Sequence, residues 1–216
     1  MLNQWLIVSG LLSAYIAGRL YLGVALPSSA NRSLAPQHAR ATLTFVLVIG
    51  LSAIFQLFFP WVRPALERNA TLVASGEWWR LVTALFVQDG GIAGSIFNLV
   101  SLMLVGRVAE RMWGSRRWLA IFAVGGILSE VVALAWRPIG AGNSVANFSL
   151  AGAVSILCVV RRTTRPAVFA AGIALASFAA LLLLRDIHGA AALSGAMTAL
   201  IFVSVSPDRV RWPAGP

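Results

Sequence analysis

Long apolar runs constrain the fold of this chain more than any other feature of its sequence. A helix needs about 20 mostly apolar residues to cross the hydrocarbon core of a bilayer. Runs of about this length recur along the 216 residues, and short polar connections separate them. They predict an all-α membrane protein with seven spans, at residues 5–26, 41–61, 81–105, 118–136, 144–160, 167–184 and 188–205. The third run is interrupted by polar residues at 88–91.

Composition supports a membrane protein. The chain is 59% hydrophobic and 11% charged, whereas soluble domains carry about 25% charged residues. All 17 basic residues are Arg, and the net charge is +10. A soluble protein with this charge could bind nucleic acid. Here the Arg residues fall in short loops between apolar runs, so they are better interpreted as topology signals, and we expect no nucleic-acid partner.

Few residues are available for metal or disulfide chemistry. Cys158 is the single cysteine, which excludes an internal disulfide and a cysteine-based metal cluster. The only histidines are His38 and His188, which makes a zinc site improbable. We therefore expect no metal and no cofactor. Residues 1–27 lack a basic leading segment and a small-residue cleavage site, so they are interpreted as a retained transmembrane helix.

The distribution of Arg predicts the orientation of the spans. Alternate loops carry 11 Arg on one side and 5 on the other, and Arg19 lies inside the first span. Cytoplasmic loops carry an excess of basic residues. The split predicts a multi-pass protein of the cell membrane whose C-terminus, the polar tail 207–216, is cytoplasmic. On the outer side it places the connection 62–80, with Trp78 and Trp79 at the headgroup level, and the connection 137–143.

The stretch 140–153, which reads G-A-G-N-S-V-A-N-F-S-L-A-G-A, places polar residues where a membrane helix should begin. Asn143 or Ser144 could simply cap that helix. Alternatively, Ser144 is a nucleophile at a helix N-terminus, whose free N–H groups can hold an oxyanion. His188 opens another helix from the same predicted side, so the two residues should lie at similar depth.

Serine and histidine at matched depth are the minimum for nucleophilic acyl chemistry. Asn98 could stabilise the oxyanion. Each residue also has a structural interpretation, since a histidine at a helix end is often interfacial and an asparagine in a membrane helix often bonds a neighbouring helix. No acidic third member occupies an obvious position. Asp186 precedes His188 by two residues and need not face it.

Five segments, in order, resemble those of the rhomboid family of intramembrane serine proteases. They are G-E-W-W-R-L-V-T-A-L-F at 76–86, F-N-L at 97–99, G-R-V-A-E-R-M-W-G-S-R-R at 106–117, G-N-S-V-A-N-F-S-L-A-G-A at 142–153 and H-G-A-A-A-L-S-G at 188–195. The resemblance covers residues 41–206. It implies a rhomboid-like six-helix bundle, to which residues 1–27 would add one N-terminal transmembrane helix.

The resemblance also implies roles for individual residues. Ser144 would be the nucleophile and His188 the base, acting on transmembrane-helix substrates near the outer face of the lipid bilayer. The oxyanion would be held by Asn98 and Gln88. Glu110 and the region of Arg80 would be structural. Supporting positions are Gly142, Asn143, Gly152 and Gly195, of which the last two would let the serine and histidine helices approach closely.

Three departures from the family pattern favour a second hypothesis, a catalytically inactive rhomboid-like protein that binds membrane helices. Val145 replaces the glycine that follows the nucleophile, which would crowd the oxyanion site. Gln88 and Gly94 stand where the family often has histidine. When the last segment is aligned on Gly195, the histidine position falls on Ala192, one helical turn or about 5.4 Å beyond His188.

Overall fold

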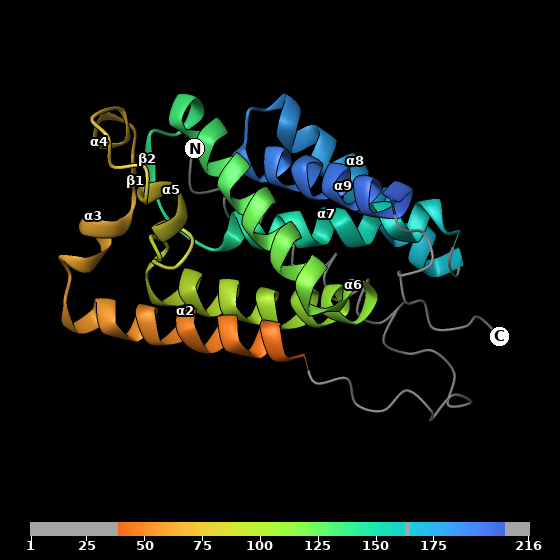
Figure 1. The fold of residues 1–216 in the computed structure, drawn as a ribbon, viewed down its shortest axis with the longest axis horizontal. Helices are drawn as coiled ribbons and strands as arrows, with labels where there is room; N and C mark the ends of the chain where they lie inside the picture. Colours follow the sequence, from red (N-terminus) through yellow and green to blue (C-terminus); the bar gives the residue numbers. More distant parts are fainter. Residues whose placement is uncertain (1–38, 163–164, 206–216) are drawn as a thin grey trace.

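The computed structural model describes residues 39–162 and 165–205. The predicted helix within residues 1–27 and the tail 207–216 lie outside the described residues. Five long helices dominate the described part: α2 (Arg40–Phe58), α6 (Gly91–Trp136), α7 (Ser144–Val160), α8 (Arg165–Leu183) and α9 (Ile187–Val205). Figure 1 shows α7 running between α2 on one side and the α8–α9 pair on the other.

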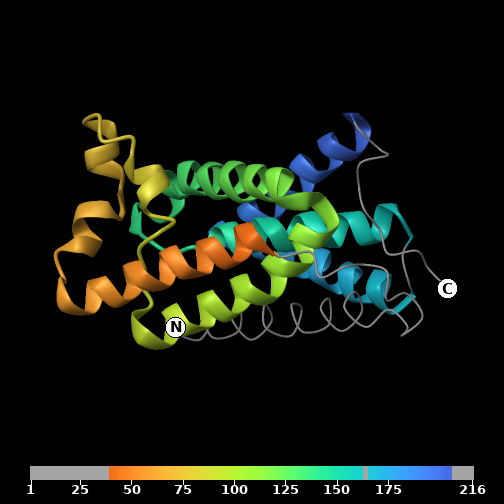
Figure 2. The same cartoon turned by 60° about the horizontal axis from the view of Figure 1, so that its bottom comes forward.

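Helix α6 contains two of the predicted spans, joined by a sharp bend at Gly114. Gly114 has φ 72° and ψ 161°, a backbone conformation that glycine adopts without steric cost. Figure 2 shows the two arms of α6 meeting at this bend. The third and fourth predicted spans left residues 106–117 as an Arg-rich loop, which was wrong, because α6 continues through them with only Gly114 outside helical geometry. Glu110 secures the bend by accepting hydrogen bonds from the Thr42 N–H and the Ser115 hydroxyl.

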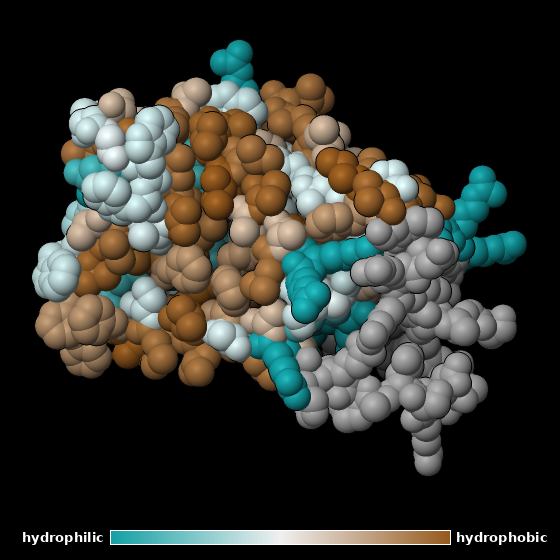
Figure 3. All heavy atoms as spheres, in the orientation of Figure 1, coloured by the Kyte–Doolittle hydropathy of each residue, from teal (hydrophilic) through white to brown (hydrophobic). Residues whose placement is uncertain are grey.

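The apolar helices make this a multi-pass membrane protein. Within the described residues, α2, α6, α8 and α9 are long and apolar enough to cross a bilayer, and α7 is a shorter apolar helix. Large apolar side chains on α2 face outward, including Leu47 at 62% exposure and Leu57 at 60%. Figure 3 shows hydrophobic surface across the middle of the visible face and hydrophilic residues toward the ends. This is the pattern expected of a surface that contacts lipid.

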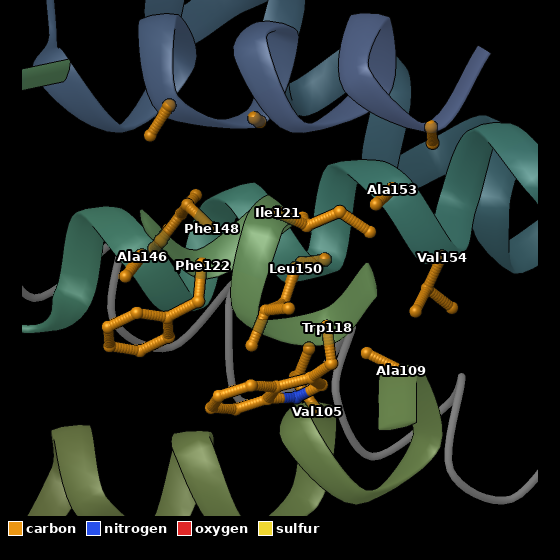
Figure 4. Close-up of a cluster of buried hydrophobic side chains, with 14 of the residues drawn as sticks. Val105, Ala109, Trp118, Ile121, Phe122, Ala146, Phe148, Leu150, Ala153 and Val154 are labelled. Atoms are coloured by element: carbon orange, nitrogen blue, oxygen red, sulfur yellow. The ribbon is translucent and has the colours of Figure 1, made fainter. Parts of the chain in front are cut away.

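Helix α7 lies at the centre of the core. Most of its side chains are buried. Leu150 points toward Trp118 of α6, and Val154 lies beside Ala109 of the same helix (Figure 4). The rings of Trp118 and Phe122 are stacked with centroids 5.2 Å apart. On its other side α7 meets α9 through small residues, as expected for helices that associate within lipid.

The connection between α2 and α6 folds into short elements at the end of the bundle where α7 begins (Figure 1). They are α3 (Val62–Leu66), β1 (Arg68–Asn69), α4 (Ala70–Ala74) and α5 (Arg80–Thr83), and β1 pairs antiparallel with β2 (Ile139–Gly140). Trp78 and Trp79 are 62% and 52% exposed, and their position at the headgroup level stays a prediction.

A buried ion pair anchors this connection to the bundle. The Arg68 guanidinium pairs with the Glu130 carboxylate, and both side chains are 1% exposed. Arg68 also donates two hydrogen bonds, at 3.1 and 2.8 Å, to the Arg137 carbonyl oxygen. The same side chain therefore holds the 137–143 connection, which leads directly into α7.

Candidate active site

Ser144 is the first residue of α7. The chain enters the helix through Gly142, whose φ of 135° suits glycine and whose N–H donates to the Ala84 carbonyl oxygen at 2.9 Å. Asn143 occupies the N-cap position but makes no side-chain cap hydrogen bond. The capping interpretation of Asn143 is therefore wrong. The Ser144 hydroxyl oxygen instead lies 3.0 Å from Nε2 of His188.

His188 lies in the first turn of α9 and is 7% exposed. Its ring packs against Phe148 of α7, with centroids 4.6 Å apart and planes inclined by 46°. His188, and not Ala192, is the residue beside Ser144. Helix α9 runs without interruption from Ile187 to Val205.

Asp186 is the neighbour of His188 that the sequence interpretation missed. Its Oδ1 lies 2.7 Å from Nδ1 of His188 and accepts a hydrogen bond from the His188 backbone N–H at 2.8 Å. Burial acts to raise the pKa of Asp186, but the hydrogen bonds from His188 and the charge of Arg137 outweigh burial and lower it. The sequence did contain a signal for this contact. Asp is a favoured N-cap residue, so an Asp just before a helix that begins with histidine could be expected to lie near that histidine.

Four amide side chains form a closed ring of hydrogen bonds beside Ser144. Asn98 Nδ2 donates to Gln88 Oε1, and Gln88 Nε2 donates to Asn143 Oδ1, both at 2.9 Å. Asn143 Nδ2 donates to Asn147 Oδ1 at 3.0 Å, and Asn147 Nδ2 closes the ring by donating to the backbone carbonyl oxygen of Asn98 at 2.9 Å. The ring brings together the predicted Asn98, Gln88 and Asn143. Asn147, one turn beyond Asn143, was not predicted.

The ring is tied to α2 as well as to α7. Gln56 of α2 donates from Nε2 to the Gln88 carbonyl oxygen, and its Oε1 accepts from the Gln88 N–H, each at 2.9 Å. This reciprocal pair fixes the backbone of Gln88, which lies in the interruption that the sequence placed at 88–91. Gln88 is thus held by α2 through its backbone and by the start of α7 through its side-chain amide.

A small space adjoins Gly142, between the hydroxyl and the amide ring. A Cβ atom at Gly142 would stand 3.6 Å from Asn98 Nδ2, 3.7 Å from Ser144 Oγ and 3.9 Å from Gln88 Oε1. Val145 is 1% exposed and belongs to the hydrophobic core; whether it crowds the oxyanion site stays a prediction. A Cβ at Gly94 would have no atom within 4 Å.

Close helix contacts hold Ser144 and His188 together. A Cβ atom at Gly152 of α7 would stand 2.1 Å from the Ala192 carbonyl oxygen, and one at Gly195 of α9 would stand 1.9 Å from the Ser149 carbonyl oxygen. Neither position can carry a side chain at this spacing.

Across the described residues, no group of three or more His, Cys, Asp or Glu side chains is arranged to hold a metal ion.

Fold and site together define a multi-pass helical membrane protein in which a hydroxyl and an imidazole from neighbouring helices are hydrogen-bonded at one end of the bundle. Comparison with known families agrees with this class. The Rhomboid domain family model matches residues 75–207. The chain therefore belongs to the rhomboid family.

Individual relatives point the same way. Rhomboid protease GluP of Bacillus subtilis (strain 168) is 39% identical over 96 residues, which are 44% of this chain and 19% of GluP. YdcA of the same organism is 33% identical over 129 residues, 55% of this chain and 63% of YdcA. Rhomboid protease AarA of Providencia stuartii is 27% identical over 111 residues, 48% of this chain and 39% of AarA. The chain spans less than two thirds of the length of each of these relatives.

Proposed function

We propose that this protein is an intramembrane serine endopeptidase that cleaves transmembrane-helix substrates near the outer membrane face. The observation that carries the proposal is the 3.0 Å separation of Ser144 Oγ and His188 Nε2. This is the distance expected between a nucleophile and its general base. Cleavage of membrane proteins would require that the substrate helix unwind at the site, because the scissile carbonyl must reach a hydroxyl at a helix N-terminus.

The chemistry follows from the positions of the two side chains. His188 Nε2 takes the hydroxyl proton as Ser144 Oγ attacks the scissile carbonyl carbon. The C–N bond breaks when the imidazolium returns this proton to the leaving amine, and an ester to Ser144 remains. Water, activated by the same imidazole, then hydrolyses the ester and regenerates the hydroxyl.

The space beside Gly142 is where the proposal places the oxyanion. Asn98 Nδ2 borders that space and has a second N–H besides the one given to Gln88. The N–H groups at the start of α7 add a positive helix terminus. Gln88 is assigned an orienting role, because its atom nearest that space is the acceptor Oε1, which holds the Asn98 amide in place.

The membrane arrangement is part of the same proposal. Residues 41–206 form the rhomboid-like six-helix core, with the two arms of α6 counted as separate spans, and residues 1–27 add a seventh. The protein resides in the cell membrane with the C-terminal tail 207–216 in the cytoplasm. The Arg-poor side, which contains the start of α7, then faces outward.

The second candidate is a rhomboid-like protein that binds membrane helices without cleaving them. One observation favours it: Gly94 leaves open space where the family often has a histidine, so one potential oxyanion donor is missing. Binding would then use the same lipid-facing helices, and the Ser144–His188 contact would be structural.

Cleavage of a model transmembrane substrate in proteoliposomes separates the two candidates. We expect Ser144→Ala and His188→Ala each to abolish cleavage, and a fluorophosphonate probe to label wild-type protein at Ser144. Ser194→Ala is the matched control, because the Ser194 hydroxyl bonds only within α9, to the Ala190 carbonyl oxygen, and it should cleave normally. Wild-type protein that neither cleaves nor is labelled would contradict the protease proposal and favour the binding candidate.

A further inference from the structure

We infer that Asp186 is a positioning residue that fixes the ring orientation and tautomer of His188, so that this chain works with a Ser–His–Asp group and not with a serine and a histidine alone. The inference rests on the proposed function. It starts from a single oxygen, Asp186 Oδ1, which contacts both Nδ1 and the backbone N–H of His188.

The contact determines which ring nitrogen carries the proton. An ionised carboxylate can only accept hydrogen bonds, and a neutral imidazole has one N–H and one acceptor nitrogen. At 2.7 Å from Asp186 Oδ1, Nδ1 must be the protonated nitrogen. Nε2 is then the acceptor, and it faces Ser144 Oγ at 3.0 Å. This is the tautomer that a general base needs in order to take the hydroxyl proton.

The turn between α8 and α9 holds the carboxylate in place. Arg185 adopts φ 56°, which reverses the chain within two residues. The Asp186 N–H donates to the Leu181 carbonyl oxygen at 2.9 Å, and the Asp186 carbonyl oxygen accepts from the Gly189 N–H at 3.1 Å. A Cβ at Gly189 would stand 2.2 Å from the Leu182 backbone nitrogen. The backbone of Asp186 is therefore bonded on both sides within a closely packed turn.

The other side of the imidazole is fixed as well. Phe148 covers the ring at a centroid distance of 4.6 Å, and the Asp186 side chain is 28% exposed while that of His188 is 8% exposed. The charge of Arg137, from the connection after α6, adds to the hydrogen bonds from His188 in lowering the pKa of Asp186. The imidazole is thus held by Asp186 at Nδ1, by Ser144 at Nε2 and by Phe148 against its face. Together these contacts orient Nε2 toward the hydroxyl.

The competing explanation is that Asp186 only caps α9, since the same oxygen accepts the His188 N–H. Asp186→Ser separates the two roles. A serine at this position still caps the helix, but its shorter side chain cannot also reach Nδ1. Asp186→Glu restores a carboxylate and serves as the partial rescue.

Two measurements test the inference. For Asp186→Ser we expect kcat to fall by on the order of 10²-fold or more, with KM and thermal unfolding close to wild type, and Asp186→Glu to recover part of the loss. In ¹⁵N-histidine NMR of the full chain carrying His38→Gln, wild-type His188 should be protonated at Nδ1, and Asp186→Ser should give a mixture of tautomers. Wild-type kcat in Asp186→Ser, or an unchanged tautomer, would overturn the inference.

Failure of the proposed function is distinguishable from failure of this inference. If the wild-type protein does not cleave, the protease proposal fails, and the tautomer measurement, which does not depend on activity, decides the role of Asp186. If the wild-type protein cleaves, Ser144→Ala does not and Asp186→Ser matches wild type, the protease proposal stands and Asp186 is only a helix cap.

Discussion

Gly152 of α7 lies directly against the carbonyl oxygen of Ala192 on α9, so that a Cβ at Gly152 would stand 2.1 Å from it. Because real Cβ atoms do not approach a neighbour this closely, the contact sets the spacing of the two helices. Those helices carry Ser144 and His188. The distance between hydroxyl and imidazole therefore depends on a glycine that takes no part in the chemistry.

Gly152→Ala should separate the two helices and abolish most cleavage. Overpacking a close contact costs about 1–3 kcal/mol, and we expect a loss of stability of that size in mixed-micelle unfolding. Gly172→Ala is the matched control, because a Cβ at Gly172 of α8 would meet no atom within 4 Å. It should keep activity and be slightly more stable, as alanine favours helix over glycine. Full activity in Gly152→Ala would show that helix spacing does not control the site.

Gly142→Ala should remove activity by filling the space proposed for the oxyanion. Its Cβ would project between Asn98 Nδ2 and Ser144 Oγ. Gly76→Ala controls for backbone strain, since Gly76 also has a positive φ, 111°, with open space around its Cβ position. Both variants should lose similar stability, and only Gly142→Ala should lose cleavage. Equal cleavage rates in the two variants would contradict the placement of the oxyanion.

Asn98→Ala should lower kcat by about 10²–10³-fold, the usual effect of removing one oxyanion donor. Asn147→Ala provides the comparison, because Asn147 belongs to the same amide ring but contributes none of the three atoms nearest to a Cβ at Gly142. Its loss leaves the Asn143 amide without an acceptor, which should cost about 1–3 kcal/mol of stability. We expect the larger kcat effect at Asn98. The reverse order would assign the oxyanion donor elsewhere.

Glu130→Gln should destabilise the protein by about 3–5 kcal/mol, since it leaves the buried Arg68 guanidinium without its counter-charge. The double variant Arg68→Met/Glu130→Leu should recover much of this loss, because it removes both buried charges. Glu67→Gln is the control. It breaks the Arg63–Glu67 pair, in which the Arg63 side chain is 45% and the Glu67 side chain 11% exposed. Solvent reaches the guanidinium and screens the pair, so we expect a loss of about 1 kcal/mol. A Glu130→Gln effect as small as the control would refute the anchoring role.

Acid should weaken the contribution of Asp186 to stability. Its pKa is lower in the folded chain than its ordinary value, so the unfolded chain binds the proton more readily. The contribution is therefore fully present above the ordinary pKa of about 3.9 and is lost as the pH falls through the folded value. The stability difference between wild type and Asp186→Asn should be constant from pH 7 to about pH 5 and shrink below about pH 4. A difference that grows on acidification would reverse the assigned sign.

Several elements could be predicted from local sequence because their signal is local. The apolar runs predicted α2, α7, α8 and α9 closely, since hydropathy and length suffice to define a helix in lipid. The bend at Gly114 was missed, because the Arg-rich segment around it suggested a loop. Whether a polar segment is helical depends on contacts such as those of Glu110, which bonds residues of α2 nearly 70 positions away.

The candidate site could be predicted only in part, where local sequence singled out a residue. Ser144 and His188 stood out as polar residues at helix starts, but the repeated small residues of α9 allowed an alignment shifted by one turn, onto Ala192. Only the packed structure places the imidazole. Asp186 and Asn147 were missed because each is defined by its partners, and no local pattern distinguishes such residues from an ordinary cap or an ordinary polar residue in a helix.

The sequence by itself determined that this protein is a bundle of membrane helices, because apolar length and basic loops report how each segment interacts with lipid and water. Only the tertiary structure decided which side chains meet. The hydroxyl, the imidazole, the carboxylate and the four amides come from helices and turns far apart in the chain, and their distances follow from close backbone contacts at glycine. Such distances are set by the packing of whole helices, which no short stretch of sequence encodes.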